Sequence, residues 1–189
     1  MTTHIIYISG LGDHYDGFRA SALKLWRLWG VTTEHVPIMW YDGGSMHAKL
    51  QRIEVAIERA PKGSRLVLIG ESAGATLALH MAERKKVDRI ITLCGVTQPD
   101  TPVSNYLRRR APALHEAVSS LGTSYTTDIH SVRAVIDGVV GKKHSVVRNA
   151  STHVIWTVGH LSTIVLCLTV LSPYIASIAK KSKSDILKI

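Results

Sequence analysis

Three residues that together could activate a nucleophile stand far apart in this sequence of 189 residues: Ser72, Asp137 and His160. Ser72 lies in residues 70–74, Gly-Glu-Ser-Ala-Gly, which fit the pattern G-x-S-x-G. A serine hydroxyl becomes a strong nucleophile when a histidine takes its proton. The imidazole in turn needs a carboxylate that fixes its tautomer and stabilises its charged form. All three residue types are present, in the order serine, acid, histidine.

The segment around Ser72 predicts a strand, a tight turn and a helix. Residues 66–69 are an unbroken apolar run, which is typical of a parallel strand buried on both faces, and residues 77–81 repeat apolar side chains at helical spacing. A serine at such a turn has a strained backbone with neighbouring chain close by, so its flanking positions favour glycine. Small residues also cluster in ordinary turns, but the strand before and the helix after favour a nucleophile here.

Strands and helices are expected to alternate along the rest of the chain. We expect six strands, at residues 4–9, 33–40, 66–69, 88–94, 131–136 and 153–158. We expect a first helix at residues 17–29, a second from an N-cap at Ser45 to residue 59, and a third directly after the G-x-S-x-G turn. One or two more are expected within residues 103–121, and a long uncharged helical segment follows the last strand and runs to residue 179. This alternation predicts an α/β fold: a three-layer, doubly wound sandwich with a mostly parallel sheet of about six strands, in a single domain over residues 1–189.

Parallel strands end at the same edge of a sheet, so residues that directly follow them can meet in space. Ser72, Asp137 and His160 each follow a predicted strand. We therefore expect these three side chains to converge.

With these motifs the chain resembles a small, lidless, esterase- or lipase-like member of the α/β-hydrolase superfamily. The resemblance implies ester hydrolysis through an acyl-enzyme on Ser72, without cofactor or metal. It also implies an oxyanion hole formed by the backbone N–H groups of Ala73 and Leu11, the latter in a Ser-Gly-Leu-Gly loop that differs from the His-Gly-Gly-Gly form of many lipases. Two N-terminal strands of larger members are missing, and residues 95–130 are too short for a large lid. Small or exposed esters are therefore the expected substrates.

Other residues compete for two of these roles. His144 and His153 are the nearest rivals of His160, but the first follows two lysines in a loop or helix and the second opens a strand. Asp100 is the rival of Asp137, because it lies in the loop after the preceding strand.

Four further polar residues lie near the expected site. For Glu71 we expect local hydrogen bonding. Three residues could line the mouth of the site, although a solvated loop is the simpler interpretation: Asp13, His14 and Asp16.

The formal net charge of +9 is spread over the sequence, with small clusters at residues 108–110, 142–143 and 180–183. No nucleic-acid-binding signature accompanies it, so we interpret it as solubility or weak attraction to an anionic surface. Residues 154–179 could span a membrane by length alone. Gly159 and the Ser172-Pro173 pair interrupt this segment, which favours a core strand and helix over stable membrane insertion.

The two cysteines, Cys94 and Cys167, have neither metal-ligand spacing nor a disulfide framework, and the N-terminus lacks an apolar signal core. These features favour a reducing, cytoplasmic location. The leading hypothesis is a serine hydrolase that acts on a small ester. The alternatives are a catalytically inactive binding module of the same fold, or a lipid-surface-associated lipase or thioesterase.

Overall fold

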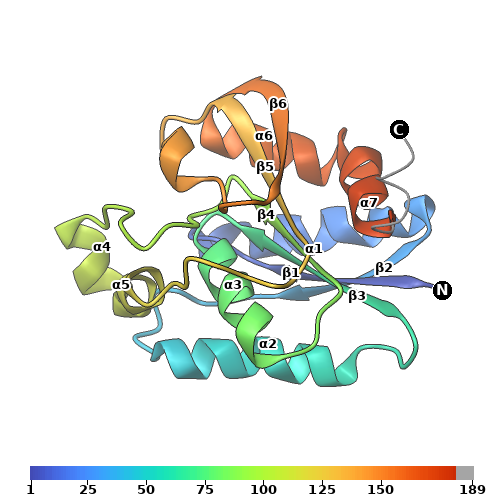
Figure 1. The fold of residues 1–189 in the computed structure, drawn as a ribbon, viewed down its shortest axis with the longest axis horizontal. Coiled ribbons are helices and arrows are strands. Elements are labelled where there is room, and N and C mark those ends of the chain that lie inside the picture. The colour runs from blue at the N-terminus through green and yellow to red at the C-terminus, as the bar shows by residue number, and fades with distance from the viewer. Residues whose placement is uncertain (182–189) are drawn as a thin grey trace.

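The computed structural model describes residues 1–181 and contains a six-stranded sheet between two layers of helices (Figure 1). The strands are β1 (Thr3–Ile8), β2 (Val31–Val36), β3 (Arg65–Glu71), β4 (Arg89–Leu93), β5 (Ile129–Ile136) and β6 (Ser151–Val158). Their order in the sheet is β2-β1-β3-β4-β5-β6, and every neighbouring pair is parallel. The predicted three-layer α/β class is confirmed, with a sheet that is entirely rather than mostly parallel.

The helices divide between the two faces because the side chains of each strand alternate between them. Ile6 and Ile8 of β1 belong to a core shared with α2 (Met46–Arg59), α3 (Gly74–Arg84) and α5 (Pro112–Ser119). Ile5 and Tyr7 belong to a second core, shared with α1 (Asp16–Lys24), α6 (His160–Leu168) and α7 (Ser172–Lys180). The short helix α4 (Asn105–Arg110) projects beyond the edge of the sheet where the strands end (Figure 1).

The second strand differs from its prediction at residues 33–40. It begins at Val31 and ends at Val36, because Pro37 has no N–H to continue the ladder. Ile38 and Trp40, whose apolar character suggested a longer strand, are buried in a loop instead. The Trp40 Nε1 donates a hydrogen bond to the carbonyl oxygen of Ser9 (3.1 Å).

Two predicted helices are also divided. The helix expected at residues 17–29 is α1 followed by a 3₁₀ helix, Leu25–Trp29, which ends at Gly30 in the left-handed conformation (φ 71°). The long uncharged segment after β6 forms two helices, α6 and α7, instead of one. The second helix begins at Ser172, and Pro173 occupies its first turn.

No single helix within residues 1–181 is long and apolar enough to cross a membrane. Taken together, α6 and α7 are long and apolar enough to cross a membrane, but the chain bends by 71° at the break between them. Ile164, Cys167 and Ile175 of this pair are buried against the sheet, as expected of core helices. The predicted basic cluster at residues 180–183 extends beyond the described residues after Lys181.

Candidate active site

Ser72 lies on the sharp turn between β3 and α3, as the G-x-S-x-G pattern predicted. Its φ of 48° is in the left-handed region, which non-glycine residues seldom adopt. Three backbone hydrogen bonds hold this conformation: Ser72 N donates to Leu93 O (2.9 Å), and Val96 N (3.0 Å) and Ala75 N (3.1 Å) donate to Ser72 O. A Cβ at Gly74 would lie 2.8 Å from the carbonyl oxygen of Ser9, so only glycine allows β1 and α3 to approach this closely.

The structure brings Ser72, His160 and Asp137 into one hydrogen-bonded chain. His160 Nε2 lies 2.9 Å from Ser72 Oγ, and its Nδ1 lies 2.8 and 2.9 Å from the two carboxylate oxygens of Asp137. Asp137 directly follows β5, and His160 is the first residue of α6 after β6. The His160 and Asp137 side chains are only 13% and 6% exposed. The three residues thus meet at the edge where the strands end.

Asp137 is surrounded by donors that favour its ionised form. Burial acts to raise the pKa of this carboxyl, but hydrogen bonds from His160 and from the backbone N–H groups of Val140 and Val139 outweigh burial, and the pKa falls below its usual value. An ionised carboxylate can only accept hydrogen bonds. The Nδ1 of His160 therefore carries a proton, and Nε2 is left to accept one from the Ser72 hydroxyl.

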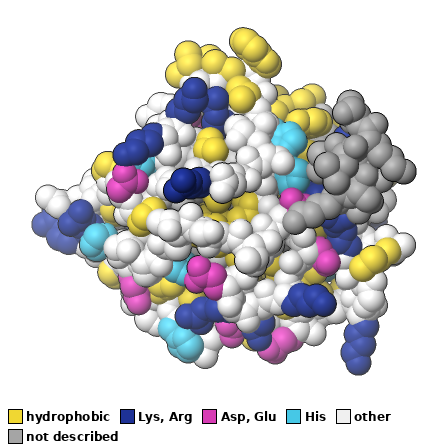
Figure 2. All heavy atoms as spheres, viewed as in Figure 1, with side chains coloured by type: hydrophobic (Ala, Val, Ile, Leu, Met, Phe, Trp, Pro, Cys, Tyr) yellow, Lys and Arg dark blue, Asp and Glu magenta, His cyan; other side chains and the backbone are white. Residues whose placement is uncertain are grey.

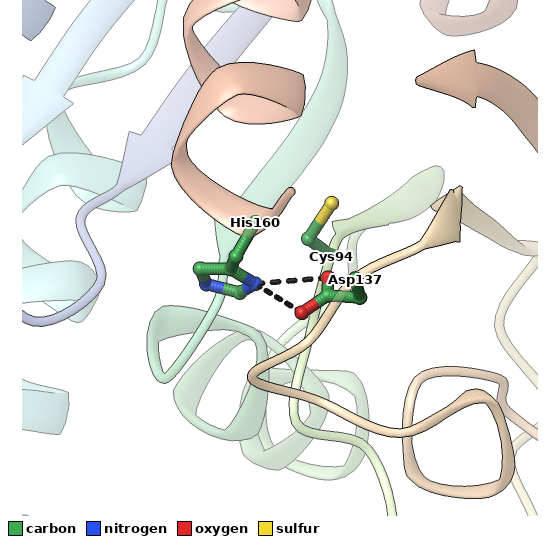
Figure 3. A group of neighbouring side chains, drawn as sticks. All are labelled: Cys94, Asp137 and His160. Atoms are coloured by element: carbon green, nitrogen blue, oxygen red, sulfur yellow. Dashed lines mark hydrogen bonds and ion pairs between the residues drawn. The ribbon is translucent and has the colours of Figure 1, made fainter. Parts of the chain in front are cut away.

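Cys94 lies beside this pair, at the end of β4 (Figure 3). One ligand atom from each of Cys94, Asp137 and His160 lies within 4.8 Å of the others, a spacing that could hold a metal ion. Burial and the nearby Asp137 raise the pKa of the Cys94 thiol strongly, whereas a metal ligand must be the thiolate. The Nδ1 and carboxylate oxygens are also engaged with each other. The group therefore suits a hydrogen-bonded pair better than a metal.

The loop after β1 lies directly against Ser72. A Cβ at Gly10 would be 2.9 Å from the Ser72 Cβ and 2.8 Å from the carbonyl oxygen of Glu71. Leu11 follows in this loop, and Ala73 stands at the start of α3. Ala73 is therefore the residue directly after Ser72, and Leu11 is the residue directly after Gly10, which lies against the serine.

A buried ion pair, which the sequence did not reveal, joins this loop to the turn. Arg19 of α1 contacts Glu71 through Nε (2.8 Å) and Nη2 (2.5 Å), and Tyr7 donates to the same carboxylate (2.6 Å). Arg19 also donates to the carbonyl oxygens of Leu11 (3.1 Å) and Gly12 (2.9 Å). The prediction that Glu71 bonds locally was wrong, because its partner Arg19 lies 52 residues away in the sequence. No local sequence pattern indicates such a pairing.

The rival residues lie elsewhere. Asp100 is exposed and pairs with Lys143 (2.6 Å) and His144 (3.4 Å). His153 contacts His130 (2.8 Å) and Tyr174 (2.9 Å).

Of the three polar residues considered for the mouth, Asp13 and Asp16 are partly buried and His14 is exposed to solvent. Asp16 pairs with Arg19 (2.9 Å), Asp13 accepts a hydrogen bond from Trp40 N (3.3 Å), and the His14 ring lies against Tyr15.

The sequence matches no protein-family model and no curated protein. Similar solved structures include a pyrethroid hydrolase from Sphingobium faniae (15% identity, TM-score 0.71, covering 97% of this chain and 100% of the other). Another is a hydrolase of the α/β superfamily from Xanthomonas campestris, with 18% identity and a TM-score of 0.65, covering 95% of this chain and 99% of the other. A third is an esterase domain from Rhodothermus marinus, with 11% identity and a TM-score of 0.59, covering 93% of this chain and 86% of the other. The chain therefore has the α/β-hydrolase fold.

Proposed function

We propose that the protein is a serine hydrolase that cleaves carboxylic esters. The observation that carries the proposal is the hydrogen-bonded chain from Ser72 through His160 to Asp137. His160 takes the proton of Ser72, whose oxygen attacks the ester carbonyl. The resulting imidazolium is stabilised by Asp137. The similar structures named as a pyrethroid hydrolase and an esterase domain agree with this class of reaction.

The oxyanion of the tetrahedral intermediate is assigned to the backbone N–H groups of Ala73 and Leu11. Such donors stabilise charge that develops in the transition state, and each typically contributes about 10²- to 10³-fold in rate. When this intermediate collapses, the ester C–O bond breaks and the imidazolium of His160 gives its proton to the departing alcohol. Water then attacks the acyl-enzyme, with His160 acting as the base a second time, and the acid leaves while Ser72 recovers its proton. No step requires a cofactor.

An apolar cavity of about 330 Å³ between α1 and α6 can take the acyl chain. Its lining includes Phe18, Leu161 and Val165, and Leu161 directly follows the proposed base. A cavity of this size and character suits a small or medium acyl chain. The inactive binding module is the less favoured alternative, because it has no need for three residues from separate elements to lie in hydrogen-bond contact.

The experiment is covalent labelling with a fluorophosphonate, followed by hydrolysis of p-nitrophenyl esters of increasing chain length. The wild-type protein should react with the probe at Ser72, and Ser72→Ala should lose both labelling and hydrolysis, by orders of magnitude. A folded wild-type protein that neither labels nor turns over any ester would support the binding module instead. The cytoplasmic location stays a prediction.

A further inference from the structure

One face of the β5–β6 edge of the sheet carries exposed apolar side chains. Strand β6 is the last strand of the sheet, and Ile155 packs into the core with α6 and α7. The neighbouring residues in the strand point the other way: Val154 is 40% exposed and Trp156 is 89% exposed. The register between the strands shifts in the stretch that contains Trp156. A tryptophan that is almost fully exposed to solvent therefore stands on an edge strand.

Positive charge lies on the same face. Arg133 of β5 is the register partner of Val154, so both side chains leave the sheet on this side. A cavity of about 920 Å³ here is lined by four basic residues: Arg133, Lys142, Lys143 and Arg148. Its lining contains one acid, Asp100, which already pairs with Lys143. The cavity is therefore strongly cationic.

Two more exposed apolar residues stand close in the sequence to the candidate active-site residues. Val158 is 69% exposed two residues before His160, and Val139 is 72% exposed two residues after Asp137. In Figure 2 hydrophobic side chains gather over β6 at the top of the view, directly above a group of Lys and Arg side chains. Apolar and cationic groups thus adjoin on one surface, which we call the β5–β6 face (Arg133, Lys142, Lys143, Arg148, Val154 and Trp156).

We propose that the β5–β6 face docks on a lipid bilayer that contains anionic phospholipid. Tryptophan is enriched at membrane–water interfaces, and each Lys or Arg near an anionic leaflet adds attraction. A small anion in the cavity would leave Trp156 in water, whereas a bilayer covers both parts. A second copy of the chain would place one cationic surface against another, which disfavours a dimer through this face.

The docking goes beyond the proposed function and does not depend on it. It would bring the strand ends that carry Asp137 and His160 close to the lipid surface, where apolar esters concentrate. Binding can be measured on Ser72→Ala, so that no turnover is involved. A failure to bind would leave ester hydrolysis untouched, and a failure to hydrolyse would leave docking untouched.

The test is co-sedimentation of the full chain with vesicles of phosphatidylcholine alone and of phosphatidylcholine mixed with phosphatidylglycerol. We expect binding only to the mixed vesicles, with an affinity that falls as salt rises. Lys142→Gln/Lys143→Gln should bind about thirtyfold more weakly, from the loss of two charges at the surface. Trp156→Ala should bind about tenfold more weakly or worse, because its apolar area leaves the interface.

Two control variants change exposed residues elsewhere. Lys62→Gln/Lys86→Gln removes the same charge from the loops that precede β3 and β4, and Leu28→Ala removes an exposed apolar side chain from the 3₁₀ helix after α1. Both should bind like the wild type, and thermal melting checks that every variant is folded. Equal weakening by the control lysines would reduce the effect to net charge and overturn the proposal. The proposal would also be overturned if the protein bound only neutral vesicles or bound no vesicles at all. A dimer in solution that Trp156→Ala dissociates would overturn it as well.

Discussion

In the proposed mechanism Asp137 orients His160 and balances its charge, through the hydrogen bonds between them. Asp137→Asn keeps the shape but places an amide where Nδ1 needs an ionised acceptor, so we expect kcat for p-nitrophenyl acetate to fall by about 10⁴, as in better-characterised triads. Asp100→Asn is the matched control, because Asp100 contacts Lys143 and His144 instead. It should leave kcat within about twofold. The reverse pattern would move the acid one strand earlier.

Arg19 and Glu71 fix the position of the loop that carries Leu11. Because both side chains are nearly inaccessible to solvent, removing one charge leaves the other buried without a partner. We expect Arg19→Leu to lower the free energy of unfolding by about 3–5 kcal/mol in urea denaturation. In a variant that still folds, kcat should fall more than KM rises, because the loop would support the oxyanion rather than substrate binding.

The exposed pair between Arg59 and Glu34 provides a control for this prediction. Its N···O distance is also 2.5 Å, but both groups are accessible to water. Arg59→Leu should therefore cost less than about 1 kcal/mol and leave kcat unchanged. If the two arginine variants lost equal stability, burial would not be the source of the Arg19 effect.

At the level of elements, the junction of β1, β3 and α3 depends on glycine. A Cβ at Gly74 would meet the carbonyl oxygens of Ser9 at 2.8 Å and of Ile8 still closer, so Gly74→Ala must push α3 away from β1. We expect a loss of about 1–3 kcal/mol in the free energy of unfolding, measured in urea, together with a large loss of esterase activity. Gly17→Ala in α1 meets no atom within 4 Å and should stabilise the protein by about 0.5–1 kcal/mol. A neutral Gly74→Ala would mean that α3 can move freely at this point.

The sequence predicted the elements whose signals are local. The apolar run of β3, the G-x-S-x-G turn and the side-chain N-cap of Ser45 on α2 were all found where expected. The predicted end of β2 was wrong. Ile38 and Trp40 are buried in a loop, and alternating apolar residues in a buried loop look the same in the sequence as those of a strand. The Arg19–Glu71 pair was missed because it depends on how α1 packs against β3, which no spacing in the sequence encodes.

For the whole molecule, histidines buried in their neutral form couple stability to pH. Burial, and then the positive charge of Arg89, lower the pKa of His130 from 6.5 to about 4, although Asp128 opposes the shift. Burial also lowers the pKa of His153, which lies 2.8 Å from His130, and those of His4 and His35. In the unfolded chain these side chains take up protons near their ordinary pKa. The unfolded state therefore binds more protons than the folded one between about pH 6.5 and pH 4.

The free energy of unfolding should therefore fall as the pH drops from 6.5 toward 4. His130 should contribute at most about 1.4 kcal/mol per pH unit to this fall. Above pH 7 these histidines are neutral in both states, so the free energy of unfolding should not depend on them. Carboxyls with lowered pKa, such as Asp42 at about 2, destabilise the fold only at lower pH, below about 4. Urea denaturation at a series of pH values measures the slope. His130→Asn should flatten it, whereas His47→Gln, a change at an exposed position on α2, should not. A wild-type stability that is constant from pH 7 to pH 4.5 would mean that these histidines are protonated in the folded protein as readily as in the unfolded chain.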